Sequence, residues 1–136
     1  MKKLQVIVCK ANKGVSANLP ELEGYVIARD TVSQLKKDLR KGVQFHIEGL
    51  YEDERKDWMN DRYDFQFIFK DIPSLVDAYS GLINQNSLAR IAGINEGQMR
   101  QYASGIKHPT KRTLDRIESG LKNYALELQS VSFAHV

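Results

Sequence analysis

The chain begins with short apolar and alternating runs and later changes to apolar positions that recur at helical spacing. Four segments carry the pattern of strands that are buried on at least one face, and they are rich in β-branched or aromatic residues. These segments are residues 4–9, 15–19, 25–28 and 65–69. Between the third and fourth segments, five apolar residues recur every three or four positions and predict an amphipathic helix that begins at Asp30 or Thr31. They are Val32, Leu35, Leu39, Val43 and Ile47.

The first half therefore has the element order β-β-β-α-β. A helix between the third and fourth strands allows those two strands to lie parallel in one sheet through a right-handed crossover, with the helix on one face. The aromatic row at 65–69 is predicted to pack against the apolar stripe of this helix. The charged segment 51–62 predicts an exposed loop, in which Trp58 and Met59 either cap the edge of the sheet or anchor a partner.

The second half of the chain changes to helices. Residues Asp71-Ile72-Pro73 break the last strand, and Pro73 predicts the start of a helix over residues 74–83. Thr110 is the predicted cap of a longer helix near the end of the chain. Its apolar stripe consists of Leu114, Ile117, Leu121, Tyr124 and Leu128. The sequence thus predicts an α+β protein, with a first domain at 1–71 and an all-helical second domain at 72–136.

Residues 84–109 predict two short helices around a tight glycine turn. Asn84 and Asn95 are the predicted caps, and Gly93 ends the first helix in a conformation that few other residues tolerate. The outward positions of the second helix are Glu96, Gly97, Gln98, Arg100 and Gln101. Amide and guanidinium groups along one face of a short helix suit base edges in a DNA major groove. An ordinary helical hairpin without a DNA role is the alternative.

Charge is distributed unevenly along the 136 residues, which carry a formal net charge of +3. Basic and acidic residues balance up to position 80, at 13 of each. From position 81 onward, seven basic residues stand against four acidic ones, so the whole excess lies in the half of the chain that contains the predicted hairpin. Contacts to DNA phosphates require positive charge in this region.

The hairpin resembles the lambda-repressor/XRE helix-turn-helix, in which Gln-x-x-Leu-Ala precedes a glycine turn and a Gly-x-x-x-Pro run follows. The matching residues are Gln85, Leu88, Ala89, Gly93, Gly105 and Pro109. The resemblance implies that the second helix reads bases and that two copies bind half-sites about one turn of DNA apart. The residues expected to contact DNA are Gln85, Asn95, Glu96, Gly97, Gln98, Arg100, Gln101, Lys107, His108, Lys111 and Arg112.

The first half resembles the HicB antitoxin domain, which has a Pro-[Asp/Glu]-x-x-Gly loop followed by a Thr-led step into a helix. Here these positions are held by Pro20, Glu21, Gly24, Asp30 and Thr31. The resemblance implies a truncated ribonuclease-H-like sheet that lacks the catalytic acids. It also implies binding to a HicA-like toxin, an mRNA-cleaving ribonuclease, together with repression of the antitoxin's own operon by the helix-turn-helix.

Expected toxin contacts lie in the loop after the second strand and at an exposed sheet edge. The loop residues are Leu19, Pro20, Glu21, Leu22 and Tyr25. The expected assembly is a homodimer or a higher even-numbered oligomer. The alternative function is a stand-alone transcriptional regulator whose first domain senses a small ligand.

No catalytic residue, metal site or cofactor is expected, so the protein is predicted not to be an enzyme. A two-metal nuclease needs clustered carboxylates, including one on the first strand, and residues 4–9 contain none. Cys9 is the one cysteine and fits a reducing compartment. The apolar run before Lys10 is too short for a signal peptide, and no stretch reaches the length of a membrane span. A cytoplasmic location without membrane contact is expected.

Overall fold

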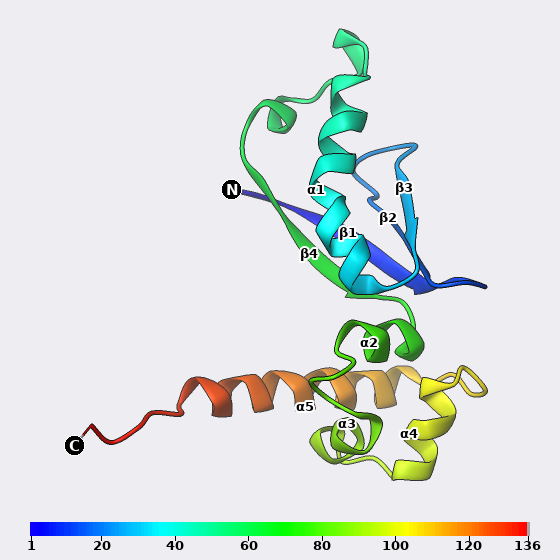
Figure 1. The fold of residues 1–136 in the computed structure, drawn as a ribbon, viewed down its shortest axis with the longest axis vertical. Helices are drawn as coiled ribbons and strands as arrows, with labels where there is room; N and C mark the ends of the chain where they lie inside the picture. Colours follow the sequence, from blue (N-terminus) through cyan, green and yellow to red (C-terminus); the bar gives the residue numbers. More distant parts are fainter. Residues whose placement is uncertain (136) are drawn as a thin grey trace. The chain divides into compact units, whose positions relative to one another are not determined.

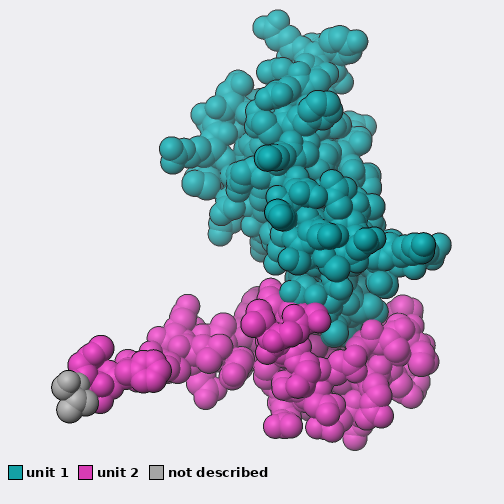
Figure 2. All heavy atoms as spheres, in the orientation of Figure 1, with its two compact units in different colours: residues 1–78 teal, residues 79–136 magenta. Residues whose placement is uncertain are grey.

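The computed structural model describes residues 1–135, and Val136 lies outside the described residues. Within this part of the chain, a mixed four-stranded sheet and five α-helices make an α+β protein (Figure 1). The chain divides into two compact units, residues 1–78 (unit 1) and 79–136 (unit 2), which Figure 2 distinguishes by colour.

Unit 1 contains the sheet, and its element order is the predicted β-β-β-α-β followed by one further helix. The elements are β1 (Lys2–Lys10), β2 (Val15–Asn18), β3 (Val26–Arg29), α1 (Val32–Glu48), β4 (Tyr63–Phe69) and α2 (Ile72–Ala78). The strand order is β3-β2-β1-β4. β1 pairs antiparallel with β2 and parallel with β4, and β2 pairs antiparallel with β3. β3 and β4 therefore run in the same direction at opposite edges of one sheet, as the helix between them predicts.

The core of unit 1 lies between α1 and the sheet. The whole predicted stripe of α1 is buried, and it meets the inward side chains Leu4, Val6 and Val8 of β1. α1 begins where the sequence predicts, because Thr31 Oγ1 accepts a hydrogen bond from the Gln34 amide at 3.1 Å. Alternation along β1 thus supplies one apolar face, and the 3.6-residue period of α1 supplies its partner.

The aromatic row of β4 packs at the margin of this core. Phe65 and Phe67 are half-buried because β4 is an edge strand, and they pack against the buried cluster. Two cations of α1 cover the rings: Lys36 Nζ lies 4.6 Å from the ring centroid of Phe67, and the Arg40 guanidinium lies 4.9 Å from that of Phe65. The aromatic row of β4 was predicted to pack against the α1 stripe, but much of the sheet surface that faces this stripe comes from β1.

The charged segment after α1 forms two short 3₁₀ helices, Glu52–Glu54 (η1) and Asp57–Asn60 (η2). Met59 is buried in the core of unit 1, and Trp58 packs edge-on against Tyr63 with ring centroids 5.8 Å apart. These two side chains close one end of the core, which favours the sheet-capping interpretation over the partner anchor.

α2 differs in position and role from the helix expected at 74–83. It spans Ile72–Ala78, and the compact units divide after Ala78 instead of after Asp71. Asp71 Oδ1 accepts from the Ser74 amide at 2.8 Å, and Asp71 Oδ2 accepts from the Lys10 amide at the end of β1 at 2.7 Å. Asp77 Oδ2 accepts from the Val32 amide at the start of α1 at 2.7 Å. These bonds fasten α2 to the sheet and α1, so it is part of unit 1.

Unit 2 contains the three helices α3 (Gln85–Ala92), α4 (Glu96–Ala103) and α5 (Lys111–Gln129). The predicted caps are confirmed, since Asn84 Oδ1 accepts from the Ser87 amide and Thr110 Oγ1 accepts from the Thr113 amide. Its small core consists of Leu88, Ala89, Ala92, Met99, Tyr102 and Ile117.

Candidate nucleic-acid interface

α3 and α4 are held as a pair by the turn between them. Gly93 has φ +67°, a left-handed conformation that strains any residue with a Cβ. Its carbonyl accepts a hydrogen bond from the guanidinium of Arg116 on α5, so the turn is also tied to the third helix. Met99 and Tyr102 are buried as predicted, which fixes the rotation of α4 about its axis. The opposite side of α4 is therefore set to face solvent.

The outward side of α4 carries polar groups beside a shallow hollow of about 690 Å³. Gln98 and Arg100 are exposed and Gln101 is half-buried. The hollow is lined by Asn95, Gly97, Gln98, Arg100, Gln101, Ser104 and Ile106. Guanidinium and amide groups form paired hydrogen bonds with guanine and adenine edges respectively, so this surface has the donors and acceptors that base reading requires.

Gly97 and Asn95 shape the first turn of α4. Asn95 Oδ1 accepts from the amides of Gly97 and Gln98 at 2.8 and 3.2 Å, so Asn95 caps the helix as predicted. A Cβ on Gly97 would lie 3.1 Å from that oxygen. The bare backbone at Gly97 leaves room for a close approach on the outward side, since no side chain projects there.

The other expected DNA contacts are distributed around unit 2. Gln85 is half-buried at the first position of α3. Exposed cationic or titratable side chains follow α4 and open α5; these are Lys107, His108, Lys111 and Arg112. None of these residues lines the hollow beside α4. Glu96 is exposed in the first turn of α4, where its carboxylate complements the positive end of the helix dipole.

Sequence reasoning missed two residues of this surface. Ser104 and Ile106 line the hollow, and Ile106 is 75% exposed. The hollow therefore combines polar groups with an exposed aliphatic side chain, and aliphatic side chains are known to contact the methyl group of thymine in DNA complexes. Ser104 and Ile106 are the two neighbours of Gly105, the glycine at which the chain leaves α4. The position of this glycine could therefore have indicated that both residues lie at the same surface as the end of α4.

The expected toxin contacts are only partly at the surface of unit 1. Leu19 and Leu22 are each 2% exposed and belong to the core, so the expectation that they contact a partner directly is wrong. Pro20 is exposed, and the Glu21 carboxylate forms an ion pair with Lys2. Both leucines belong to the same buried cluster as the inward side chains of the sheet and α1, so the loop directs them into the core.

Tyr25 lies in the groove between β3 and α1. Its ring meets His46 edge-on at a centroid distance of 5.5 Å, and its hydroxyl lies against Gly42, where a Cβ would overlap it. Burial raises the pKa of the Tyr25 phenol, Arg29 opposes this shift, and Asp38 adds to it. The groove encloses about 460 Å³. It is lined by residues of β3 and α1 together with Tyr25, Gly49 and Leu50.

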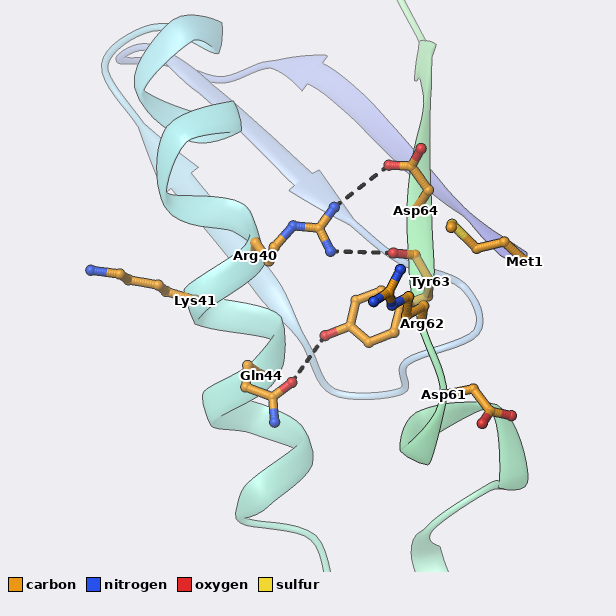
Figure 3. A pocket seen from close by; sticks show the side chains of 8 residues that line it. All are labelled: Met1, Arg40, Lys41, Gln44, Asp61, Arg62, Tyr63 and Asp64. Atoms are coloured by element: carbon orange, nitrogen blue, oxygen red, sulfur yellow. Dashed lines mark hydrogen bonds and ion pairs between the residues drawn. The ribbon is translucent and has the colours of Figure 1, made fainter.

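A second hollow of unit 1 lies between α1 and the start of β4 (Figure 3). Arg40 donates to the Tyr63 carbonyl at 3.2 Å and pairs with Asp64 at 3.5 Å. The Tyr63 hydroxyl donates to Gln44 Oε1 at 3.3 Å, and burial raises the pKa of this phenol. Lys41 points away from the hollow in Figure 3. These groups satisfy one another instead of converging on a shared ligand position.

Residues 1–135 lack two other features that would indicate a function. No group of three or more His, Cys, Asp or Glu side chains in this range could hold a metal ion. None of the helices described is long and apolar enough to span a bilayer.

Comparison with known proteins gives one partial similarity. The chain is 31% identical over 51 residues to a protein of Haemophilus phage HP1 described as an uncharacterized 14.9 kDa protein in the rep-hol intergenic region. The match covers 38% of this chain and 38% of that protein. No protein-family model and no solved structure matches the chain.

Proposed function

We propose that unit 2 binds double-stranded operator DNA, with α4 in the major groove and α3 behind it. The observation that carries the proposal is the outward side of α4, where Arg100 and Gln101 stand beside the bare backbone of Gly97. Buried Met99 and Tyr102 hold the helix in that rotation. The resemblance to the lambda-repressor/XRE pattern and the net charge of +3 in this half support the same function.

The exposed cations after α4 supply the second part of the mechanism. In this proposal the exposed side chains of Lys107, Lys111 and Arg112 contact phosphates. The base edges are contacted by Gln98, Arg100 and Gln101. Phosphate contacts release counterions, so affinity falls steeply as salt rises. The cations after α4 provide affinity for DNA of any sequence, and the side chains of α4 provide specificity for one sequence.

The test is a fluorescence anisotropy titration of the full chain with a duplex from the region upstream of its own gene. Each good bidentate base contact is worth about 1–3 kcal/mol. Gln98→Ala combined with Arg100→Ala should therefore raise Kd about 30-fold or more for that duplex. It should change the affinity for an unrelated duplex far less.

The matched control is Arg62→Ala, which removes an exposed cation from unit 1 and should leave both affinities near those of the parent. If the double variant binds the upstream duplex as tightly as the parent, α4 is not the reading helix. Loss of binding to both duplexes in equal measure would assign these side chains to phosphate contact only.

For unit 1 we propose a protein-binding role, the neutralisation of a HicA-like mRNA-cleaving toxin by occlusion, on a truncated ribonuclease-H-like sheet. Together the two units make a HicB-like antitoxin that represses its own operon. The supporting observation is a difference between the two sheet edges. At the β4 side Lys36 and Arg40 lie over the aromatic rings of the strand, whereas the β3 side exposes Val26 at 66% beside Phe45 at 80%. An unpaired edge next to an apolar groove suits addition of a partner strand.

Co-expression tests this second role with the full chain and the product of the neighbouring toxin gene. Phe45→Asp should abolish protection from growth arrest, because it places a charge in the groove beside β3. Tyr51→Asp is the matched control, since Tyr51 is also a highly exposed aromatic residue but does not line that groove. Protection by both variants contradicts the β3 site. Absence of any toxin gene beside this one favours the stand-alone regulator.

A further inference from the structure

The hollow beside α4 contains an apolar side chain among polar ones. Of the residues within 1–135 that line it, Ile106 is the one with an apolar side chain, and it is 75% exposed. Single exposed aliphatic residues are common on protein surfaces, so the exposure by itself identifies no site. The position is informative, because Ile106 lines the same hollow as Arg100 and Gln101, which are proposed to contact base edges.

The backbone on both sides of Ile106 is bonded to the last turn of α4. The Gly105 amide donates to the Tyr102 carbonyl at 3.1 Å, and the Lys107 amide donates to the Gln101 carbonyl at 3.3 Å. Gly105 allows this return of the chain because its φ is +82°, in the left-handed region. The β-branched side chain of Ile106 also has few favoured rotamers. Ile106 is therefore held beside Gln101 before DNA binds, and its contact requires little further loss of conformational freedom.

The chemistry of the major groove identifies what an apolar side chain meets there. Base edges present hydrogen-bond donors and acceptors in this groove, and the C5-methyl of thymine is the apolar group among them. An aliphatic side chain placed against a donor or acceptor would remove water from it without replacing the hydrogen bond. A helix that carries Ile106 into the groove thus gains affinity where the side chain meets thymine.

We propose that Ile106 contacts the C5-methyl of one thymine in the operator, next to the base that Gln101 contacts, and selects thymine at that position. This proposal rests on the proposed operator binding. It adds a specificity-determining residue that lies outside α4, and it states a feature of the operator sequence.

The experiment is an anisotropy titration of the full chain with the upstream duplex, in which one thymine at a time is replaced by uracil. Uracil keeps the base pair and lacks only the methyl group. At one position the replacement should raise the parent's Kd about fourfold, the value for one buried methyl group. Ile106→Ala should bind the unmodified duplex at least about fourfold more weakly, with less than about 1.5-fold further loss from uracil at that position. Ile106→Val keeps a branched apolar side chain and should retain the response to uracil.

The matched control is Leu82→Ala, because Leu82 is an exposed aliphatic residue of unit 2, at 84%, that does not line the hollow. It should retain both the parent's Kd and its response to uracil. Ile106 lies outside the core of unit 2, so thermal unfolding of the two alanine variants should coincide with that of the parent.

The outcomes separate this proposal from operator binding itself. A parent that prefers the upstream duplex to an unrelated one, yet responds to no uracil replacement, overturns the thymine contact and leaves operator binding standing. An Ile106→Ala variant that keeps the full response to uracil also overturns the contact alone. A parent without preference for the upstream duplex overturns both proposals.

Discussion

Gly120→Ala tests the packing of α5 on the helix-turn-helix, and two opposing effects decide its sign. Gly120 lies inside α5, where replacement of glycine by alanine ordinarily stabilises a helix by about 1 kcal/mol. Here an added Cβ would overlap the Ile91 carbonyl oxygen and would lie 3.0 Å from Ala92 Cα. Both atoms belong to the backbone of α3, so no side-chain rotation can relieve the contact.

The clash should outweigh the gain in helix propensity. Overpacking of a well-packed contact costs about 1–3 kcal/mol, and a rigid backbone neighbour places this case in the upper part of that range. After the propensity gain is subtracted, we expect the free energy of unfolding of unit 2 to fall by about 1–2 kcal/mol. In a unit of this size such a loss lowers Tm by several degrees.

Urea and thermal unfolding of the full chain, followed by circular dichroism at 222 nm, provide the measurement. Ser119→Ala is the control, because Ser119 is the exposed neighbour of Gly120 on the same helix and gains propensity without a clash. A Gly120→Ala variant as stable as the parent, or more stable, would show that α5 moves freely away from α3. That outcome would refute the close contact on which this reasoning depends.

Two further variants probe a helix cap and a half-buried phenol. Asn95→Ala should lower the free energy of unfolding by about 1 kcal/mol in urea titrations, because two amides of α4 lose their acceptor. An unchanged urea midpoint would mean that water replaces the Asn95 side chain as the acceptor for these two amides. The pKa of Tyr25 is raised from 10.0 by burial, so the stability that it contributes is fully present below pH 10 and is lost as pH rises through its folded-state pKa. Tyr25→Phe should therefore lose less stability than the parent when urea unfolding is compared below and above pH 10, and equal losses would contradict this linkage.

Local chemistry made many elements predictable from the sequence. Thr31, Asn84 and Asn95 each have a side-chain oxygen that accepts from an amide two or three residues later, so the helix starts are encoded by neighbours in the chain. The stripe of α1 and the inward turn of Met99 were predictable for the same reason, since periodicity alone determines which side is buried.

The features that the sequence did not predict depend on contacts between distant residues. The bond from the Val32 amide to Asp77 joins positions 45 residues apart, and no local pattern indicates that α2 belongs with the sheet. Leu19 and Leu22 lie in a loop rich in polar and turn residues, yet both side chains are buried in the core. The hollow beside α4 likewise includes Ile106, which lies outside the helix that the pattern identified.

The carboxylates of Asp71 and Asp77 determine where the chain can be divided for study of its parts. A fragment that ended at Asp71 would lose the acceptor for the first amide of α1. It would also lose the side chain of Ile72, which is 4% exposed, and would therefore uncover the apolar surface that this side chain contacts. Such a fragment should be expressed poorly or precipitate, although it contains every strand. A fragment that ends after Ala78 keeps both carboxylates with the groups that they bind, and is the one suited to isolated binding or spectroscopic work.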